Sequence, residues 1–419
     1  MKKVRPSEQK RKELEALLER DTLDVIEDFH RIGQEKLYQE ALEAEVDAHL
    51  GRSWYARKEK GAQGYRNGYY RRSVTVPGSR LKVSVPRIRD PRKKFRSRLL
   101  QAVARIADRV KTLALEMYVR GLSTRDVEQA FVTEKGESVL SRSAMSRLAS
   151  RLYDDYLAFS QRDLSQLDVA FLFVDAVYEA VRHYSAGQTL LCAWAICADG
   201  SKRFLHLSAV QSETQDAWEA FFQDMLRRGL RQPLLVVSDG APGLIGAITK
   251  CFPQADRQRC IAHKLRNLES KLPRGSAKAI LREFKAVYYA PDRATADVLA
   301  EGLIRRYAAS YPGAVQCFSD DLEASLTHLK YPSGHRQYIR TTNMLERTFE
   351  EEKRRTKVMP QHQHERGALG LVFGVLIRAS QRWLRVSMSP LELTQLKALR
   401  DIIYPRTTEP HLVSYRSAA

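Results

Sequence analysis

Residues 169–182 read Val-Ala-Phe-Leu-Phe-Val-Asp-Ala-Val-Tyr-Glu-Ala-Val-Arg, and residues 234–240 read Leu-Leu-Val-Val-Ser-Asp-Gly. Each is an apolar run of strand length that carries an aspartate, Asp175 in the first and Asp239 in the second. Such runs are typical of strands that are buried on both faces of a sheet. Because buried carboxylates are rare unless they are paired or bind metal, both aspartates require partners. Taken singly, each could also be a strand-end residue that accepts backbone hydrogen bonds.

The segments around these two runs predict an α/β fold. The predicted order is three strands, a helix, a strand, a helix, a strand and a basic helix, at residues 169–182, 189–197, 204–210, 213–228, 234–238, 242–251, 256–261 and after His263. Three consecutive strands followed by alternating helices and strands is the order of the ribonuclease H-like fold, a mixed sheet with helices on both faces. In this topology strand 234–238 lies beside strand 169–182, so Asp175 and Asp239 converge.

Two adjacent carboxylates would repel each other, whereas a divalent cation would make their proximity favourable. A two-metal site for phosphoryl transfer normally has a third carboxylate. The predicted helix 341–357 offers four candidates: Glu346, Glu350, Glu351 and Glu352. Periodicity does not choose among them, and a run of glutamates beside lysines and arginines is also typical of a solvated helix face.

The N-terminal part of the chain predicts DNA-binding elements. Residues 7–50 have helical periodicity, and the runs 73–76 and 81–85 flank Pro77-Gly-Ser79 as in a β-hairpin. Arginines alternate with tyrosines before the hairpin, at Arg66, Arg71 and Arg72. Such side chains can pair with phosphates and stack on bases, although a solvated basic face is the alternative.

Two further helices resemble a helix-turn-helix with a lengthened turn. Ser123-x-x-Asp126 is an N-cap signature, and a second helix begins at Arg142. Met145, Leu148, Ala149 and Leu152 share the face predicted to be buried. The opposite face would contact DNA through Ser143, Ser146, Arg147 and Arg151. A plain helical bundle is the alternative, because the turn is longer than in the minimal motif.

Other features narrow the class of protein. The chain has 419 residues, 70 Lys and Arg against 50 Asp and Glu, and a net charge of +20, which attracts polyanions such as nucleic acid. Five cysteines without a Cys-x-x-Cys pair favour the cytoplasm. No apolar run approaches the length of a membrane span, and no signal peptide is evident. Cys260-x-x-His263 provides too few ligands for structural zinc, and its role stays open.

The order of several motifs resembles the Mutator-like transposases of bacterial insertion sequences, over about residues 40–385. The motifs are Glu43-Ala-Glu-Val-Asp-Ala-His-Leu50, Gly64-Tyr-Arg-Asn-Gly-Tyr-Tyr70, Arg120-Gly-Leu-Ser-Thr-Arg-Asp126, Phe173-Val-Asp-Ala-Val-Tyr178, Ser238-Asp-Gly240, Arg259-Cys-Ile-Ala-His-Lys-Leu-Arg-Asn267, Thr342-Asn-Met-Leu-Glu-Arg347 and Arg354-Arg-Thr-Lys-Val358. The resemblance implies a DDE enzyme with Asp175, Asp239 and Glu346 as catalytic residues and metal ligands. It also makes Cys260 and His263 a family signature near the active site.

The resemblance further implies two Mg²⁺ ions, replaceable by Mn²⁺, and DNA partners, namely the terminal inverted repeats and the target. We expect a homodimer on DNA and a cytoplasmic, nucleoid-associated protein. The expected organisation is an N-terminal helical region, a basic hairpin, a helix-turn-helix domain, the first part of the core, a helical insertion, the second part of the core and a tail, at residues 1–60, 61–100, 101–155, 165–275, 276–334, 335–390 and 391–419. The alternatives are a structure-specific nuclease of the same fold and a DNA-binding regulator with an inactive core.

Overall fold

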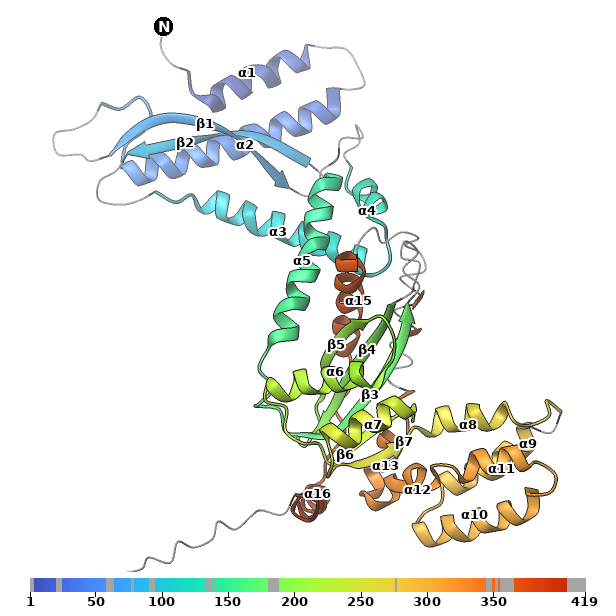
Figure 1. Ribbon diagram of the computed structural model, residues 1–419. Coiled ribbons are helices and arrows are strands. Elements are labelled where there is room, and N and C mark those ends of the chain that lie inside the picture. The colour runs from blue at the N-terminus through green and yellow to red at the C-terminus, as the bar shows by residue number, and fades with distance from the viewer. Residues whose placement is uncertain are drawn as a thin grey trace, which may run out of the picture. The chain divides into compact units, whose positions relative to one another are not determined.

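The computed structural model describes residues 4–19, 25–57, 64–76, 79–89, 95–132, 138, 140–179, 188–275, 277–343, 349–350, 353–354 and 365–404. The chain divides into two compact units, Met1–Ser150 and Arg151–Ala419. Helix α5 (Arg142–Gln161) crosses this division, and Figure 1 shows the elements of both units. The two units are described separately below.

The first unit contains the predicted helices and hairpin. Its elements are α1 (Pro6–Leu18), α2 (Val25–Leu50), β1 (Tyr65–Val76), β2 (Ser79–Arg89), α3 (Arg98–Val119) and α4 (Thr124–Ala130). The antiparallel pairing of β1 with β2 confirms the hairpin. It is longer than predicted, because the arginine- and tyrosine-rich segment before Ser73 belongs to β1. An apolar cluster that includes Leu42 of α2 and Leu81 of β2 joins helix to hairpin.

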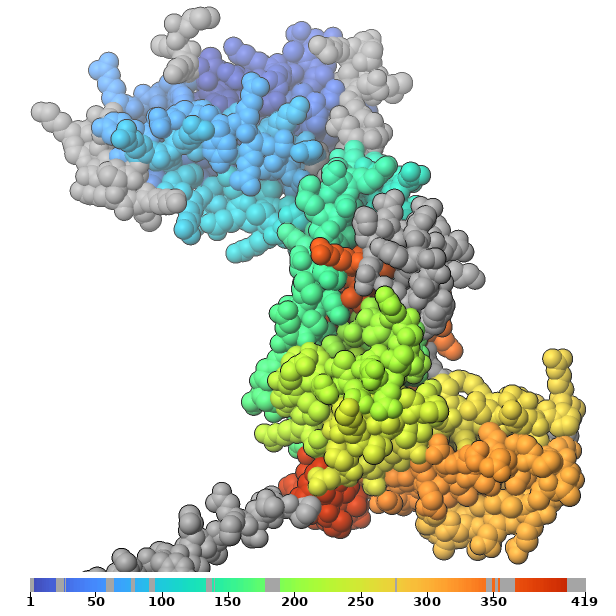
Figure 2. Space-filling view, in the orientation of Figure 1, coloured from blue at the N-terminus to red at the C-terminus, as the bar shows by residue number. Residues whose placement is uncertain are grey.

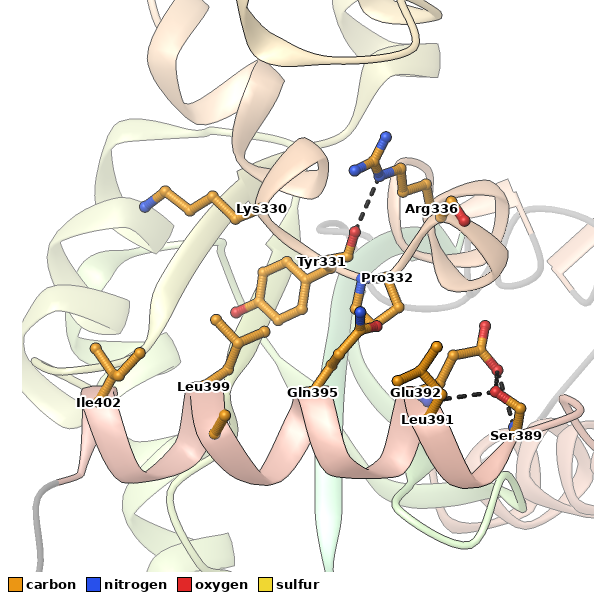
Figure 3. Close-up of a pocket in the computed structure, with 12 residues that line it drawn as sticks. Lys330, Tyr331, Pro332, Arg336, Ser389, Leu391, Glu392, Gln395, Leu399 and Ile402 are labelled. Carbon is orange, nitrogen blue, oxygen red and sulfur yellow. Dashed lines mark hydrogen bonds between the residues drawn. The ribbon is translucent and has the colours of Figure 1, made fainter.

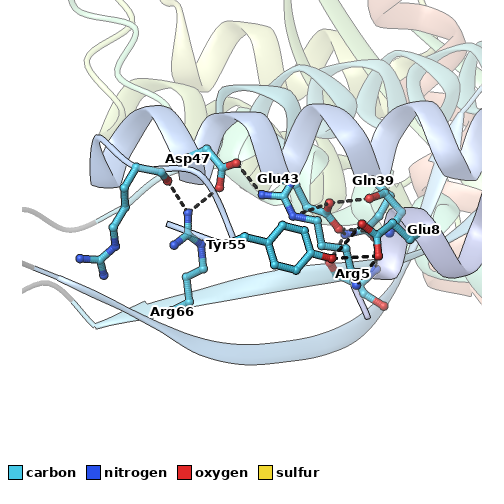
Figure 4. A network of polar contacts seen from close by, with 10 residues as sticks. Arg5, Glu8, Gln39, Glu43, Asp47, Tyr55 and Arg66 are labelled. Atoms are coloured by element: carbon cyan, nitrogen blue, oxygen red, sulfur yellow. Dashed lines mark hydrogen bonds and ion pairs between the residues drawn. The ribbon is translucent and has the colours of Figure 1, made fainter. Parts of the chain in front are cut away.

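A polar network also holds α1 on α2 (Figure 4). The buried Glu43 carboxylate accepts hydrogen bonds from Ser7 N at 3.2 Å, Ser7 Oγ at 2.6 Å and Gln39 Nε2 at 3.1 Å. Asp47 pairs with Arg5 at 2.6 Å and with Arg66 at 2.5 Å. Glu43 and Asp47, which belong to the first motif quoted above, are therefore bound within this unit.

The second unit is built on a mixed sheet of five strands. These are β3 (Val169–Glu179), β4 (Gln188–Cys197), β5 (Lys202–Val210), β6 (Leu235–Ser238) and β7 (Asp256–Arg259), in the order β5-β4-β3-β6-β7. The pairs β3–β4 and β4–β5 are antiparallel, whereas β3–β6 and β6–β7 are parallel. The predicted neighbourhood of the first and fourth strands is thus confirmed.

Helices cover both faces of this sheet (Figure 1). Leu172 and Val174 of β3 pack in one cluster with α6 (Gln215–Arg227) and α7 (Pro242–Cys251). Phe171 and Phe173 pack in the other cluster, with α5 and α15 (Glu365–Ser380). This alternation confirms that the 169–177 run is buried on both faces.

The region after β7 is helical, as predicted. It contains α8 (Ile261–Glu269), α9 (Ala277–Tyr288), α10 (Arg293–Tyr307), α11 (Pro312–Ser319), α12 (Leu322–Leu326) and the 3-10 helix η1 (Thr327–Lys330). These helices have an apolar core of their own and form a separate lobe in Figure 2. Helix α13 (Ser333–Ile339) follows, and α16 (Pro390–Ile403) occupies most of the described part of the predicted tail.

The predicted boundary between the last strand of the sheet and the helix that follows it is wrong. Strand β7 ends at Arg259 instead of Ile261, and α8 begins at Ile261 instead of after His263. Cys260 has extended backbone angles and is the N-cap residue, so the helix begins one residue later. His263 therefore lies in the first turn of α8. The predicted helix 341–357 falls largely outside the described residues.

Candidate active site

Asp175 and Asp239 occupy equivalent positions on two adjacent parallel strands. Phe171, Leu172 and Phe173 of β3 pair with Leu235, Val236 and Val237 of β6, a constant offset of 235 − 171 = 64 residues. The two aspartates have the same offset, 239 − 175 = 64. Neighbouring strands are about 4.8 Å apart, so the register brings Asp175, inside β3, level with Asp239, which directly follows β6.

Asp175 is a buried carboxylate, with 7% of its surface exposed. Since side chains alternate along a strand, it lies on the same face as Phe173 and Val177, which pack in the cluster that contains α15. Its Oδ1 accepts a hydrogen bond from Ala176 N at 3.0 Å. Asp175 thus lies in the central strand of the sheet, on the face covered by the cluster that contains α15.

Asp239 is positioned by a tight turn. Its Oδ1 accepts a hydrogen bond from Ala241 N at 3.0 Å, and α7 starts at Pro242. Gly240 has a φ of +83°, and a Cβ there would lie 1.4 Å from Nη1 of Arg259. Only glycine satisfies both the left-handed backbone and the close approach of this guanidinium. The glycine after Asp239 is therefore required both by the turn and by the neighbouring Arg259 side chain.

Glu213 is an acidic residue near Asp239 that the sequence pattern did not single out. Its side chain is exposed overall, and its Oε1 accepts a hydrogen bond from Trp218 Nε1 at 3.1 Å. Partial desolvation of the carboxyl group raises the pKa of Glu213, and the charge of Asp239 raises it further. Glu213 directly precedes the N-cap residue Thr214, a position without a periodic signal.

Cys260 follows β7, the neighbour of β6 on the side away from β3, and lies level with Asp239. The pairing of Ser238 with Arg259 gives the offset 259 − 238 = 21, which also relates Asp239 to Cys260. The fully buried Sγ of Cys260 accepts hydrogen bonds from both N and Oγ1 of Thr342, each at 3.3 Å. Burial raises the pKa of the Cys260 thiol. The hydrogen bond and the charge of His263, together with the hydrogen bond of Thr342, lower this pKa by more, so the net shift is downward.

Glu346 lies outside the described residues, so its position is not placed with the aspartates. Described residues before and after Glu346 in the sequence contact residues close to the two aspartates. Thr342 is bonded to Cys260, and Phe349, which is 5% exposed, packs in the same cluster as Phe173. Among the described side chains, no three His, Cys, Asp or Glu residues gather to hold a metal ion.

The candidate DNA-binding residues of α5 follow the predicted pattern of exposure. Met145, Leu148 and Leu152 are buried, and Ala149, the fourth residue of the predicted face, is half-buried. The polar candidates Ser143, Ser146, Arg147 and Arg151 are exposed. Arg71 and Arg72 of the hairpin are also exposed, whereas Arg66 pairs with Asp47 and donates to Arg52 O at 2.6 Å. Arg66 is therefore engaged within the first unit.

A cavity of about 670 Å³ lies between α16 and the segment 330–336 (Figure 3). Tyr331, which lines it, donates to Leu234 O at 3.0 Å and to Asp256 Oδ2 at 3.1 Å. These partners mark the amino ends of β6 and β7, opposite Asp239. Ligands of open α/β sheets usually bind at the carboxyl ends of the strands, whereas this cavity lies at the amino ends of β6 and β7.

Comparison with known families assigns the chain. The family described as "Transposase, Mutator family" matches residues 6–386, which includes both aspartates and the Cys-x-x-His pair. The chain belongs to the Mutator family of transposases. Membership of a transposase family implies cleavage and transfer of DNA, and the net charge of +20 agrees with a DNA partner.

Several curated transposases of this family are similar to the chain. The transposase for insertion sequence element ISRM5 of Rhizobium meliloti is 32% identical over 369 residues, 87% of this chain and 92% of the relative. The transposase for IS6120 of Mycolicibacterium smegmatis is 33% identical over 65% of this chain and 84% of the relative. The transposase for IS256 in Tn4001 of Staphylococcus aureus is 29% identical over 83% of this chain and 89% of the relative.

Within the described residues, every helix is too short or too polar to cross a membrane.

We expect Gly240→Ala to lower the free energy of unfolding by about 1–3 kcal/mol, because it strains the backbone and displaces Arg259. Gly33→Ala is the matched control. Gly33 lies inside α2, and a methyl group added there would meet no atom within 4 Å, so this change should stabilise by up to about 1 kcal/mol. Denaturant unfolding measures both. Equal stability of Gly240→Ala and the wild type would contradict the strained turn.

Proposed function

We propose that this transposase cleaves the ends of an insertion sequence and joins the freed 3′-OH to target DNA by two-metal phosphoryl transfer. Asp175, Asp239 and Glu346 would be its DDE residues. The observation that carries the proposal is the shared register of Asp175, inside β3, and Asp239, at the carboxyl end of β6. The sheet order supports a ribonuclease H-like core, since three antiparallel strands are extended by two parallel ones.

The described residues fit divalent metal. Two carboxylates about one strand spacing apart, one of them buried, provide the hard oxygen ligands that Mg²⁺ prefers. When bound, two ions would activate the attacking oxygen and stabilise the leaving oxygen. Asp175, Asp239 and Glu346 would hold these ions. Mn²⁺ accepts the same ligands and would substitute.

The residues around the acidic pair would hold this arrangement. The Gly240 turn fixes Asp239, and the Cys260–Thr342 contact fixes the start of the segment that carries Glu346. Water would first attack the phosphodiester at the element end and release a 3′-OH, and that hydroxyl would then attack a target phosphodiester. Each step exchanges one P–O bond for another, so neither ATP nor a covalent protein intermediate is needed.

The first unit would recognise the terminal inverted repeats. The exposed face of α5 would enter a major groove, while Arg71 and Arg72 would contact phosphates and Arg66 would support the hairpin through Asp47. Because two DNA ends must be processed together, we propose that the protein acts as a homodimer on DNA.

We predict that Asp175→Asn, Asp239→Asn and Glu346→Gln each abolish end cleavage, because each removes a charged metal ligand without changing core volume. Cleavage by the wild type should require Mg²⁺ or Mn²⁺ and stop in EDTA. Cleavage of a labelled end duplex measures activity, and a gel-shift titration should give wild-type affinity for all three variants. Wild-type cleavage by any one variant would exclude that residue from the site.

The same assay separates the alternatives. A structure-specific nuclease would cut the end duplex without joining it to a target plasmid, whereas a regulator with an inactive core would bind the end and leave it uncut. Joined products that depend on Asp175 would support the proposal over both.

We predict that Thr342→Val lowers the cleavage rate at least tenfold and raises the Mg²⁺ concentration needed for half-maximal cleavage, because the isosteric side chain cannot donate to Cys260 Sγ. Thr342→Ser keeps this donor and is the matched control. Its metal dependence should resemble that of the wild type. If Val and Ser variants lose activity equally at unchanged metal dependence, Thr342 has only a packing role.

We predict that Arg147→Ala weakens binding to the element end by about 1–3 kcal/mol and relaxes sequence preference, as for a base-reading arginine. Arg71→Ala should instead weaken end and random duplexes alike and reduce the salt slope by about 1. Titrations on both duplexes at several salt concentrations measure this difference. An Arg147→Ala variant with unchanged affinity for both duplexes would identify residues 142–150 as part of a structural bundle.

A further inference from the structure

One face of α9 carries a row of cations that ends in an exposed aromatic ring. Lys278, Arg282, Lys285 and Tyr289 are exposed and follow each other at intervals of four, three and four residues. Residues at this spacing share one helix face, and Tyr289 continues the helical turn because its N–H donates to Lys285 O at 3.2 Å. At 1.5 Å per residue the row is about 16 Å long. We call these four residues the α9 row.

The charges of the α9 row are not neutralised. Within the described part of the chain, none of its three cations forms a salt bridge with a carboxylate. Glu283, the acidic residue of the same helix, lies on another face and pairs with Arg306 of α10 at 2.6 Å. Arg293 of α10 likewise pairs with Asp297 at 2.8 Å and also with Glu323. None of these ion pairs involves a cation of the α9 row, so this face of α9 stays positively charged.

The aromatic end of the row carries still more positive charge. The guanidinium of Arg340 lies 3.9 Å from the centre of the Tyr289 ring, and the Lys285 ammonium lies 5.0 Å from it. Tyr289 remains 43% exposed despite these two contacts. An exposed ring with cations around it is suited to nucleic acid, since phosphates pair with the cations and bases stack on the ring.

The same end of the row is connected to the candidate active site. The carbonyl of Arg340 accepts a hydrogen bond from Ile261 N at 2.9 Å, in the first turn of α8 and directly after Cys260. Two residues beyond Arg340, Thr342 is bonded to Cys260, which lies level with Asp239. The Tyr289 end of the α9 row is therefore connected through Arg340 to the residues beside Asp239.

We propose that the α9 row binds the phosphate backbone of the DNA next to the reacting phosphodiester, with Tyr289 and Arg340 as the contact closest to the site. This proposal rests on the catalytic function proposed above, because that function brings DNA to Asp175 and Asp239. It adds a second DNA-binding surface, in the helical lobe, to the one expected in the first unit.

The test compares two triple variants of the full chain that lose the same charge. Lys278→Ala/Arg282→Ala/Lys285→Ala removes the row, and Arg231→Ala/Arg305→Ala/Lys397→Ala removes three exposed cations elsewhere in the second unit, so both have a net charge of 20 − 3 = +17. Affinity for an end duplex that extends beyond the cleavage site is titrated against salt. We expect the row variant to reduce the salt slope by about 3, since each lost contact removes about 0.9, and the control to change it far less. Equal slopes for the two variants would overturn the proposal.

A photo-crosslinking amino acid at Ala286, which is exposed beside Arg282 and Lys285, identifies the partner directly. We expect cross-links to DNA adjacent to the cleavage site. Cross-links to a second copy of the chain and none to DNA would make this face a protein interface and overturn the proposal.

The outcome for the α9 row is distinguishable from that for catalysis. A wild type that binds the duplex without cleaving it would contradict the catalytic proposal, and the slope comparison would still report on α9. Normal cleavage together with an unchanged slope for the row variant would overturn the α9 proposal alone. Tyr289→Ala against Tyr289→Phe tests the ring, since Phe preserves stacking and should retain wild-type affinity.

Discussion

The parallel pairing of β3 with β6 is the constraint on which the candidate site depends. Three backbone-paired residues on each strand fix the offset of 64, and this offset is what puts Asp175 level with Asp239. A shift by one residue would turn one aspartate to the other face of the sheet. The apolar clusters on both faces oppose such a shift, because Phe173 and Val174 would exchange environments. Core packing thus sets the geometry of the acidic pair.

Much of this arrangement could be predicted from residues alone. The apolar runs before Asp175 and Asp239 predict strands buried on two faces, and the order of elements predicts which strands are neighbours. Helical periodicity also identified the buried face of α5, where Met145, Leu148 and Leu152 are inaccessible. In each case the local pattern and the tertiary environment impose the same requirement, so the local signal is sufficient.

Other features depend on contacts between distant residues, which a periodic pattern does not contain. Arg66 has the same sequence context as Arg71 and Arg72, yet Asp47 of α2 pairs with it. Periodicity could not single out Glu346 from its neighbours, and only the family resemblance selects it. The hydrogen bonds from Thr342 to Cys260 join residues 82 positions apart, and neither residue indicates the other in the sequence. The early start of α8 follows from the backbone angles of Cys260 rather than from composition.

The helical lobe has a further consequence for how the enzyme holds its shape. The backbone contact between Ile261 and Arg340 closes a loop of 340 − 261 = 79 residues. As a flexible chain, a loop of this length would oppose closure with an entropic cost of about 4 kcal/mol. The lobe folds around its own apolar core, which holds its two ends close together. The packing of this core therefore offsets most of the entropic cost of closing the loop. The stability of the lobe therefore controls the position of Thr342. Partial unfolding of the lobe, far from the sheet, would release Thr342 while leaving Asp175 and Asp239 in place.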